Sequence, residues 1–143
     1  YRTIAGHPCH AYSRDEGKTW TPSAFMTYRP GGELVENPRA ANFVRKLEEG
    51  PYKGKFIYWF HNNNLRGYEE RNPAFLCGGE EEDSCDGKVI VWNKPLPVLY
   101  SKDKTVRISY PDFIWDEGLF ITETQKTIAR VHKIPDEFLK QLW

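Results

Sequence analysis

Polar side chains able to bind or process a small molecule stand at the ends of the strand-like segments of this sequence. In an antiparallel up-and-down sheet, the start of the first strand, the end of the second and the start of the third lie at one edge. We therefore expect these groups to gather on one rim, where they can hold a sugar. They are Asn37, Arg39, Arg107, Tyr110 and Asp112 at the starts of first strands, His61–Asn64, Glu123 and Gln125 at the ends of second strands, and Arg71, Asn72 and Lys126 at the starts of third strands.

The cysteines indicate a disulfide rather than a metal site. Cys77 and Cys85 flank the segment CGGEEEDSC, which is typical of an exposed loop, and we predict a bond between them, with two reduced thiols as the alternative. Cys9 is left over, either buried or paired outside the chain, and Cys9-His10 lacks the spaced second pair of ligands that a zinc site needs. The acids Glu80–Asp83 are expected to form a solvated loop tip rather than a calcium site.

These groups must be positioned by a β-rich chain. Its 143 residues are enough for one domain with a core, and Val, Ile and Thr number 23 against 17 for Ala, Leu and Met together. Short alternating segments separated by Gly, Pro and Asp turns predict strands, and only the terminus, with Pro and acids in its first turn, predicts a helix. The predicted strands are 10–13, 20–28, 39–47, 55–62, 73–77, 88–92, 98–100, 106–115, 119–124 and 127–134.

Charge and hydropathy exclude two classes of partner. Twenty basic residues balance twenty acidic ones, so no net charge attracts a nucleic acid. The longest apolar run, Phe56 to Phe60, is far shorter than the ~20 residues that cross a bilayer, and no signal-peptide pattern is present.

The sequence contains an internal repeat. An acidic-glycine turn leading to a Trp and then a Pro occurs at 15–22 and again at 86–95. Repeats of a four-stranded unit are the signature of propeller blades, with chance similarity among short hairpins as the alternative. This interpretation divides the chain into half a blade (1–30), one complete blade (36–101), three strands of another (105–134) and a terminal helix (135–143).

The first copy of the repeat carries the most specific motif. Ser13, Asp15, Gly17, Thr19 and Trp20 match S-x-D-x-G-x-T-W at every fixed position, and the segment resembles the Asp box of the sialidase (neuraminidase) superfamily. The resemblance implies an all-β, six-bladed sialidase-type β-propeller of which this chain supplies the C-terminal part, about two and a half blades. In such a box the carboxylate caps its own turn and the tryptophan packs between blades, roles in folding and not in catalysis.

Further segments resemble the catalytic positions of that family. By resemblance Tyr110 is the nucleophile, Glu36 is the base that activates it, and Arg71 is the third arginine of a carboxylate-binding triad. A phenol suits an anionic sugar, because a carboxylate nucleophile would repel it, and a phenol of pKa about 10 needs a base within reach. The rim residues Arg39, Arg107, Asn62, Asp112 and Glu123 complete the expected substrate-binding set.

Two features of this set leave alternatives open. The family's second arginine is replaced by the segment 61–64 (His-Asn-Asn-Asn), which weakens the expectation of a sialic acid carboxylate. Tyr110 could be an ordinary strand residue and Glu36 a solvated turn acid, while Arg71 and Arg107 could simply pair with Asp112 or Glu123.

The resemblance therefore implies an exo-glycosidase of sialidase type that removes terminal sugars from extracellular glycans. The alternative is a non-catalytic extracellular propeller for glycan binding or protein assembly. In either case we expect no cofactor and no metal, a glycan ligand, and another polypeptide or further copies of the chain to complete the ring. The expected location is secreted or extracellular, with lysosomal and periplasmic compartments as alternatives.

Overall fold

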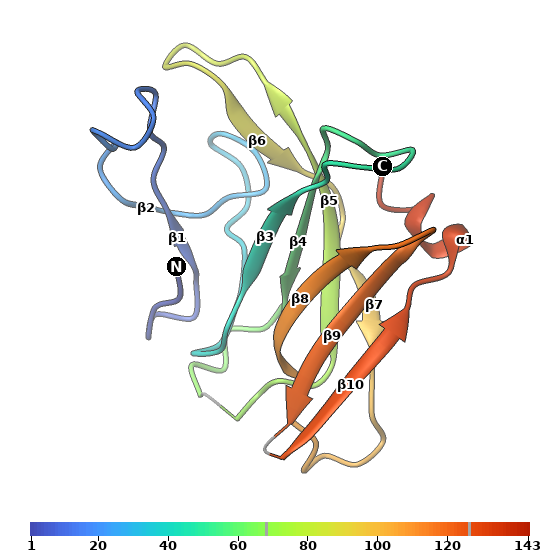
Figure 1. Cartoon of the computed structure of the whole chain (residues 1–143). Coiled ribbons are helices and arrows are strands. Elements are labelled where there is room, and N and C mark those ends of the chain that lie inside the picture. Colours follow the sequence, from blue (N-terminus) through green and yellow to red (C-terminus); the bar gives the residue numbers. More distant parts are fainter. Residues whose placement is uncertain (68, 126) are drawn as a thin grey trace.

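The computed structural model describes residues 1–67, 69–125 and 127–143; Lys126, one of the predicted rim residues, lies outside them. The described residues form ten strands and one short helix (Figure 1). In chain order these are β1 Cys9–His10, β2 Ala24–Phe25, β3 Phe43–Lys46, β4 Phe56–Phe60, β5 Ala74–Glu82, β6 Val89–Trp92, β7 Leu96–Leu99, β8 Ser109–Trp115, β9 Leu119–Gln125, β10 Ile128–Lys133 and α1 Asp136–Leu139.

The strands form three antiparallel sheets. β1 pairs with β2, the order β3-β4-β5-β6 makes a second sheet in which β7 also pairs with β5, and β10-β9-β8 makes the third. The prediction of a β-rich chain with one short C-terminal helix is confirmed. The strand predicted at 20–28 is reduced to Ala24–Phe25, followed by a single bridge between Thr27 and Leu34.

Strand β5 runs further than the sequence predicted. The acids Glu80–Glu82 belong to the strand and pair with Val89–Val91 of β6, so the prediction of a loop tip for them is wrong. The physical reason is cross-strand charge compensation, because Lys55 lies 2.8 Å from Glu80 and Lys46 lies 3.3 Å from Glu81.

The core lies on both sides of β4. Alternate side chains of a strand point to opposite faces, so Ile57 and Trp59 face the β8–β10 sheet while Tyr58 and Phe60 face the N-terminal segment. All four are at most 1% exposed. The larger cluster adds Leu47, Ala74, Leu76, Ile108, Phe113, Leu119, Ile121, Ile134, Leu139 and Leu142, and the smaller adds Met26, Val35, Cys77 and Trp92.

The C-terminal segment is held against the middle of β5. Helix α1 follows Pro135 and carries Asp136 and Glu137 in its first turn, as predicted. Beyond it, the Leu142 carbonyl accepts a hydrogen bond of 2.8 Å from Asn93 Nδ2. A Cβ atom built on Gly78 would lie 2.6 Å from Trp143 Nε1, so a glycine is needed for this close approach.

The predicted bond between Cys77 and Cys85 is contradicted, because all three cysteines have free thiols. Cys77 is buried in β5, whereas Cys85 is exposed in the turn beyond the strand. The extended strand from Cys77 to Glu82 rises about 3.3 Å per residue. That carries the chain well beyond the ~7 Å Cα separation that a disulfide allows.

Gly78→Ala tests the close approach of the C-terminal segment. The added methyl group must displace Leu142 or Trp143, and we expect the free energy of unfolding in urea to fall by about 1–3 kcal/mol. Gly67→Ala is the control, since its nearest non-local atom would lie at an ordinary contact distance of 3.5 Å. Equal stability of the two variants would contradict the assigned contact.

Thiol labelling tests the cysteine assignment. We expect Cys85 to react with iodoacetamide in the native protein, and Cys77 to react only after unfolding, because burial protects its sulfur and raises the pKa of its thiol. Mass spectrometry without reduction measures both sites. A peptide joining Cys77 to Cys85 in freshly isolated protein would overturn the assignment.

Candidate functional site

The Asp-box segment forms a self-contained turn. Asp15 accepts hydrogen bonds from the Thr19 main-chain N–H at 2.8 Å and from Thr19 Oγ1 at 2.7 Å, while Ser13 Oγ accepts one from Gly17 N at 2.7 Å. Gly17 has a φ of +87°, which favours glycine. Because its groups are used by the turn, the segment has a structural role in this chain.

Trp20 is not the core residue that the sequence predicted. Its side chain is 62% exposed and donates a hydrogen bond of 3.1 Å from Nε1 to the Gly17 carbonyl. The reason is that β1 and β2 form a sheet of only two strands, and the described residues provide no layer that covers the indole.

Three strand ends are tied together at one edge of the five-stranded sheet. The buried Asn37, which precedes β3, accepts a hydrogen bond of 2.9 Å from the His61 main-chain N–H just after β4. The His61 ring lies 3.2 Å, through Nδ1, from the carbonyl oxygen of Pro73 just before β5. These strand ends therefore share the lower edge of the sheet in Figure 1.

His61 is neutral at this edge and donates from Nδ1 to the Pro73 carbonyl. Burial and the nearby charge of Arg71 lower its pKa to about 4, although the hydrogen bond to Pro73 opposes the shift. A carbonyl can only accept, so Nδ1 carries the proton and Nε2 is left with a lone pair. Among the described residues, His61 Nε2 has no hydrogen-bond partner.

Arg71 joins this edge to the β8–β10 sheet. Its carbonyl accepts a hydrogen bond of 3.1 Å from Ile108 N, and Nη1 donates one of 2.9 Å to Ser109 Oγ. The guanidinium carbon lies 5.6 Å from the centre of the Tyr110 ring, within cation–π range. Arg71 and Tyr110, expected together from the resemblance, thus lie side by side.

Tyr110 is held out from its sheet. It is 59% exposed and has a φ of +51°, a conformation uncommon for an aromatic residue. The cause is an irregularity in the pairing of β8 with β9 between Ser109 and Asp112. The Tyr110 side chain is therefore largely open to solvent, with the Arg71 guanidinium over its ring.

A cavity of about 320 Å³, here called the Arg71 cavity, is lined by Arg71 but not by Tyr110. Among its described lining residues two side chains are acidic and two are basic, so the formal charges of these residues balance. Its lining residues are Glu69, Glu70, Arg71, Asn72, Tyr100, Ser101, Lys104 and Val106.

The expected partnership of Glu36 with Tyr110 is not formed. Glu36 Oε1 accepts a hydrogen bond of 2.8 Å from Asn64 Nδ2. Across the described residues, no hydrogen bond links Glu36 to Tyr110, and so no base is positioned on the phenol.

Two rim charges have partners of their own. Asp112 pairs with Arg45 at 2.7 Å, and Arg107 pairs with Glu69. The sequence offered ion pairing as an alternative role for Arg107. Arg107 does form an ion pair, but with Glu69 rather than with Asp112 or Glu123.

Two rim residues serve local structure. Arg39 is exposed and its main-chain N–H donates to the Gly67 carbonyl at 2.9 Å. Asn62 accepts a hydrogen bond of 3.3 Å from the Tyr28 hydroxyl. Neither lines the Arg71 cavity.

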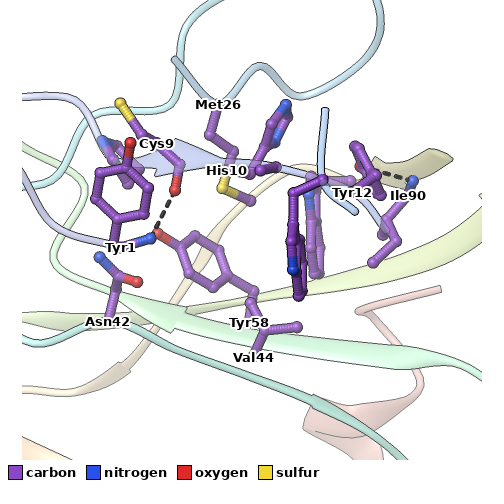
Figure 2. Close-up of a pocket in the computed structure, with 13 residues that line it drawn as sticks. Tyr1, Cys9, His10, Tyr12, Met26, Asn42, Val44, Tyr58 and Ile90 are labelled. Atoms are coloured by element: carbon purple, nitrogen blue, oxygen red, sulfur yellow. Dashed lines mark hydrogen bonds between the residues drawn. The ribbon is translucent and has the colours of Figure 1, made fainter. Parts of the chain in front are cut away.

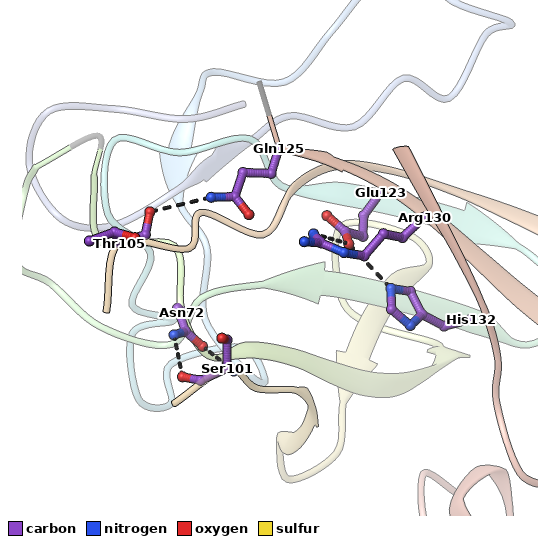
Figure 3. Close-up of polar contacts among 7 residues, drawn as sticks. All are labelled: Asn72, Ser101, Thr105, Glu123, Gln125, Arg130 and His132. Atoms are coloured by element: carbon purple, nitrogen blue, oxygen red, sulfur yellow. Dashed lines mark hydrogen bonds and ion pairs between the residues drawn. The ribbon is translucent and has the colours of Figure 1, made fainter. Parts of the chain in front are cut away.

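Glu123 is buried in an ion-pair cluster that the sequence analysis missed. It is 1% exposed, and its Oε1 lies 3.1 Å from Arg130 Nη1 and 3.2 Å from His132 Nε2 (Figure 3). A sequence signal was available, because Arg130 stands directly opposite Glu123 in the pairing of β9 with β10, and His132 lies two residues further on the same face.

A segment between β7 and β8, residues 101–105, connects the two sheets. Asn72 binds the Ser101 main chain twice, with Nδ2 to O at 2.8 Å and N to Oδ1 at 3.0 Å (Figure 3). At the other end, Gln125 Nε2 donates to the Thr105 carbonyl at 3.3 Å.

A larger cavity, about 580 Å³, lies elsewhere, between the N-terminal segment and the five-stranded sheet (Figure 2). Its walls are mostly aromatic and apolar, and no acid, lysine or arginine is among its described lining residues. Asn42 Nδ2 and the Tyr58 hydroxyl are buried there without partners among the described residues. None of the predicted catalytic or substrate-binding residues lines it.

Comparison with known proteins gives no relative. No family model, no curated protein and no solved structure matches this chain. In the described part of the chain, no three His, Cys, Asp or Glu side chains gather as a metal site would require. The one helix found there is too short to cross a membrane.

The Asp-box turn predicts a pH-dependent stability. The hydrogen bonds from Thr19 lower the pKa of Asp15 below its ordinary value of 3.8, so the carboxylate stabilises the fold above that pH and this contribution is lost as the pH falls through the lowered pKa. Asp15→Asn should therefore lower the urea midpoint at pH 6, and the deficit should shrink towards pH 2. A deficit that stays constant over this range would contradict the role of the charge.

Proposed function

We propose that this chain binds a terminal sugar of an extracellular glycan at the Arg71 cavity, as the C-terminal part of a sialidase-type β-propeller. The observation that carries the proposal is Arg71, which lines that cavity while its guanidinium lies over the exposed ring of Tyr110. A guanidinium keeps several N–H donors for ligand oxygens, and an aromatic face suits the apolar face of a sugar ring.

The grouping of strands supports the propeller. The strands fall into antiparallel sets in which chain neighbours mostly pair, and box-like turns join β1 to β2 and β5 to β6. On the face opposite Phe113 and Ile121, the β8–β10 sheet leaves Ile114 47% and Val131 66% exposed, a surface that a neighbouring blade would cover. Another polypeptide or further copies of the chain would complete the ring.

Hydrolysis by an exo-glycosidase is the second candidate. It is favoured by the strained backbone of Tyr110, since conformations of this kind concentrate at functional sites. In this reaction the phenol gives its proton to a base and its oxygen bonds to the anomeric carbon, while the glycosidic bond breaks and the leaving oxygen takes a proton from an acid. Water then attacks the anomeric carbon, which releases the sugar and restores the phenol. Sugar binding is preferred to hydrolysis as the proposed function, because a base must accept the phenolic proton and Glu36 is hydrogen-bonded to Asn64 instead.

Variants of the pair test both candidates by glycan-array binding and by turnover of fluorogenic glycosides, sialosides included. Arg71→Gln should weaken glycan binding at least tenfold, because a charge-assisted hydrogen bond contributes about 1.5–3 kcal/mol. Tyr110→Ala should weaken it as well. Tyr110→Phe keeps the ring and should bind normally; it abolishes turnover if the protein is a hydrolase.

Arg2→Gln is the matched control, since Arg2 is an exposed arginine that lines neither cavity near this edge. Binding that survives both Arg71→Gln and Tyr110→Ala unchanged would refute the proposed surface.

A further inference from the structure

The cluster around Glu123 leaves one carboxylate oxygen unused. Oε1 receives both Arg130 and His132, whereas Oε2 is buried and has no hydrogen-bond partner among the described residues. Figure 3 shows the carboxylate of Glu123 beside Arg130 and His132, with dashed lines marking the two contacts. A buried carboxylate oxygen without a donor is costly, so this atom calls for a hydrogen-bond donor.

Space for a ligand is present at the same place. Glu123, Arg130 and His132 line a cavity of about 390 Å³, the Glu123 cavity. It is more than ten times the ~30 Å³ that one water occupies in the liquid, and it falls within the size range of small-molecule sites. Its other walls include Val106 and Ile108, so apolar surface faces the charged cluster.

The charges in the cavity select a neutral ligand. An ammonium group that donated to Glu123 Oε2 would lie close to the Arg130 guanidinium, and an anion would meet the Glu123 carboxylate. A hydroxyl can donate to Oε2, and an adjacent hydroxyl can accept one of the remaining N–H groups of Arg130. Neighbouring hydroxyls of this kind are the common feature of sugars.

We propose that the Glu123 cavity is a second subsite that binds adjacent hydroxyls of a neutral sugar residue. It adjoins the first, because Tyr100, Ser101 and Val106 line both the Glu123 cavity and the Arg71 cavity. The link between the two subsites rests on the proposed function. A glycan would then lie across the segment 101–105, with its terminal residue at Arg71 and the next at Glu123.

Saturation-transfer NMR on the full chain tests the subsite, with galactose, glucose, mannose and N-acetylglucosamine as probes and N-acetylneuraminic acid as the anionic comparison. We expect at least one neutral sugar to bind. Glu123→Gln replaces one carboxylate oxygen by a donor group and should weaken that binding at least tenfold. Glu117→Gln, in the exposed β8–β9 turn, is the matched control and should bind as the parent does.

Tyr100→Ala is a second test variant that should fold normally, because this residue is 70% exposed and its truncation leaves the core intact. It should also weaken neutral-sugar binding. Arg71→Gln separates the two proposals. If Arg71→Gln loses neutral-sugar binding and Glu123→Gln keeps it, the second subsite alone is refuted. If Glu123→Gln loses binding and Arg71→Gln keeps it, the second subsite is supported even if the Arg71 surface binds nothing. Absence of any neutral-sugar signal, or full binding by both Glu123→Gln and Tyr100→Ala, would overturn the subsite and leave an internal ion pair only.

Discussion

Burial of strand β4 on both faces is the constraint on which the rest of this structure depends. A strand with no exposed face must be covered by two layers, and the sequence Phe-Ile-Tyr-Trp-Phe supplies large apolar groups to both. One layer is the β8–β10 sheet with helix α1, and the other is the N-terminal segment with β6. Because β4 is fixed from both sides, the residues at its end, beginning with His61, have a fixed position.

Arg71 connects the fixed end of the five-stranded sheet to the candidate site. Its main chain binds Ile108 while its side chain binds Ser109 and lies over Tyr110, so one residue aligns the edges of two sheets. Asn72, the next residue, holds the segment 101–105 that forms a wall of both cavities. The candidate site is thus formed where the two sheets meet, from the segment before β5, the segment 101–105 and the start of β8.

Local patterns in the sequence were enough for most of the strands, since alternation and glycine turns mark them directly. They also placed the strand ends of the rim at one edge. Local patterns could not identify hydrogen-bond and ion-pair partners that lie far apart in the sequence and are brought together by packing. Glu36 bonds to Asn64 rather than Tyr110 because of the path of the loop after β4. Cys85 is remote from Cys77 because β5 continues through Glu82, where Lys46 and Lys55 compensate the charges of Glu81 and Glu80. Arg130 and His132 were missed because their role depends on strand register.

The pairing of chain neighbours within the sheets has a kinetic consequence. Contacts between strands that follow one another close short loops, and isolated hairpins form in about 1–10 μs. The pairs β3–β4, β4–β5, β8–β9 and β9–β10 are of this local kind, whereas the bond from Ile108 to Arg71 spans a long stretch of chain. Contacts between residues far apart in the chain form late, because the chain loses the entropy of closing a long loop before the contact stabilises the fold. The candidate site is therefore completed only when the sheets dock, so a nascent or partly folded chain does not yet contain it.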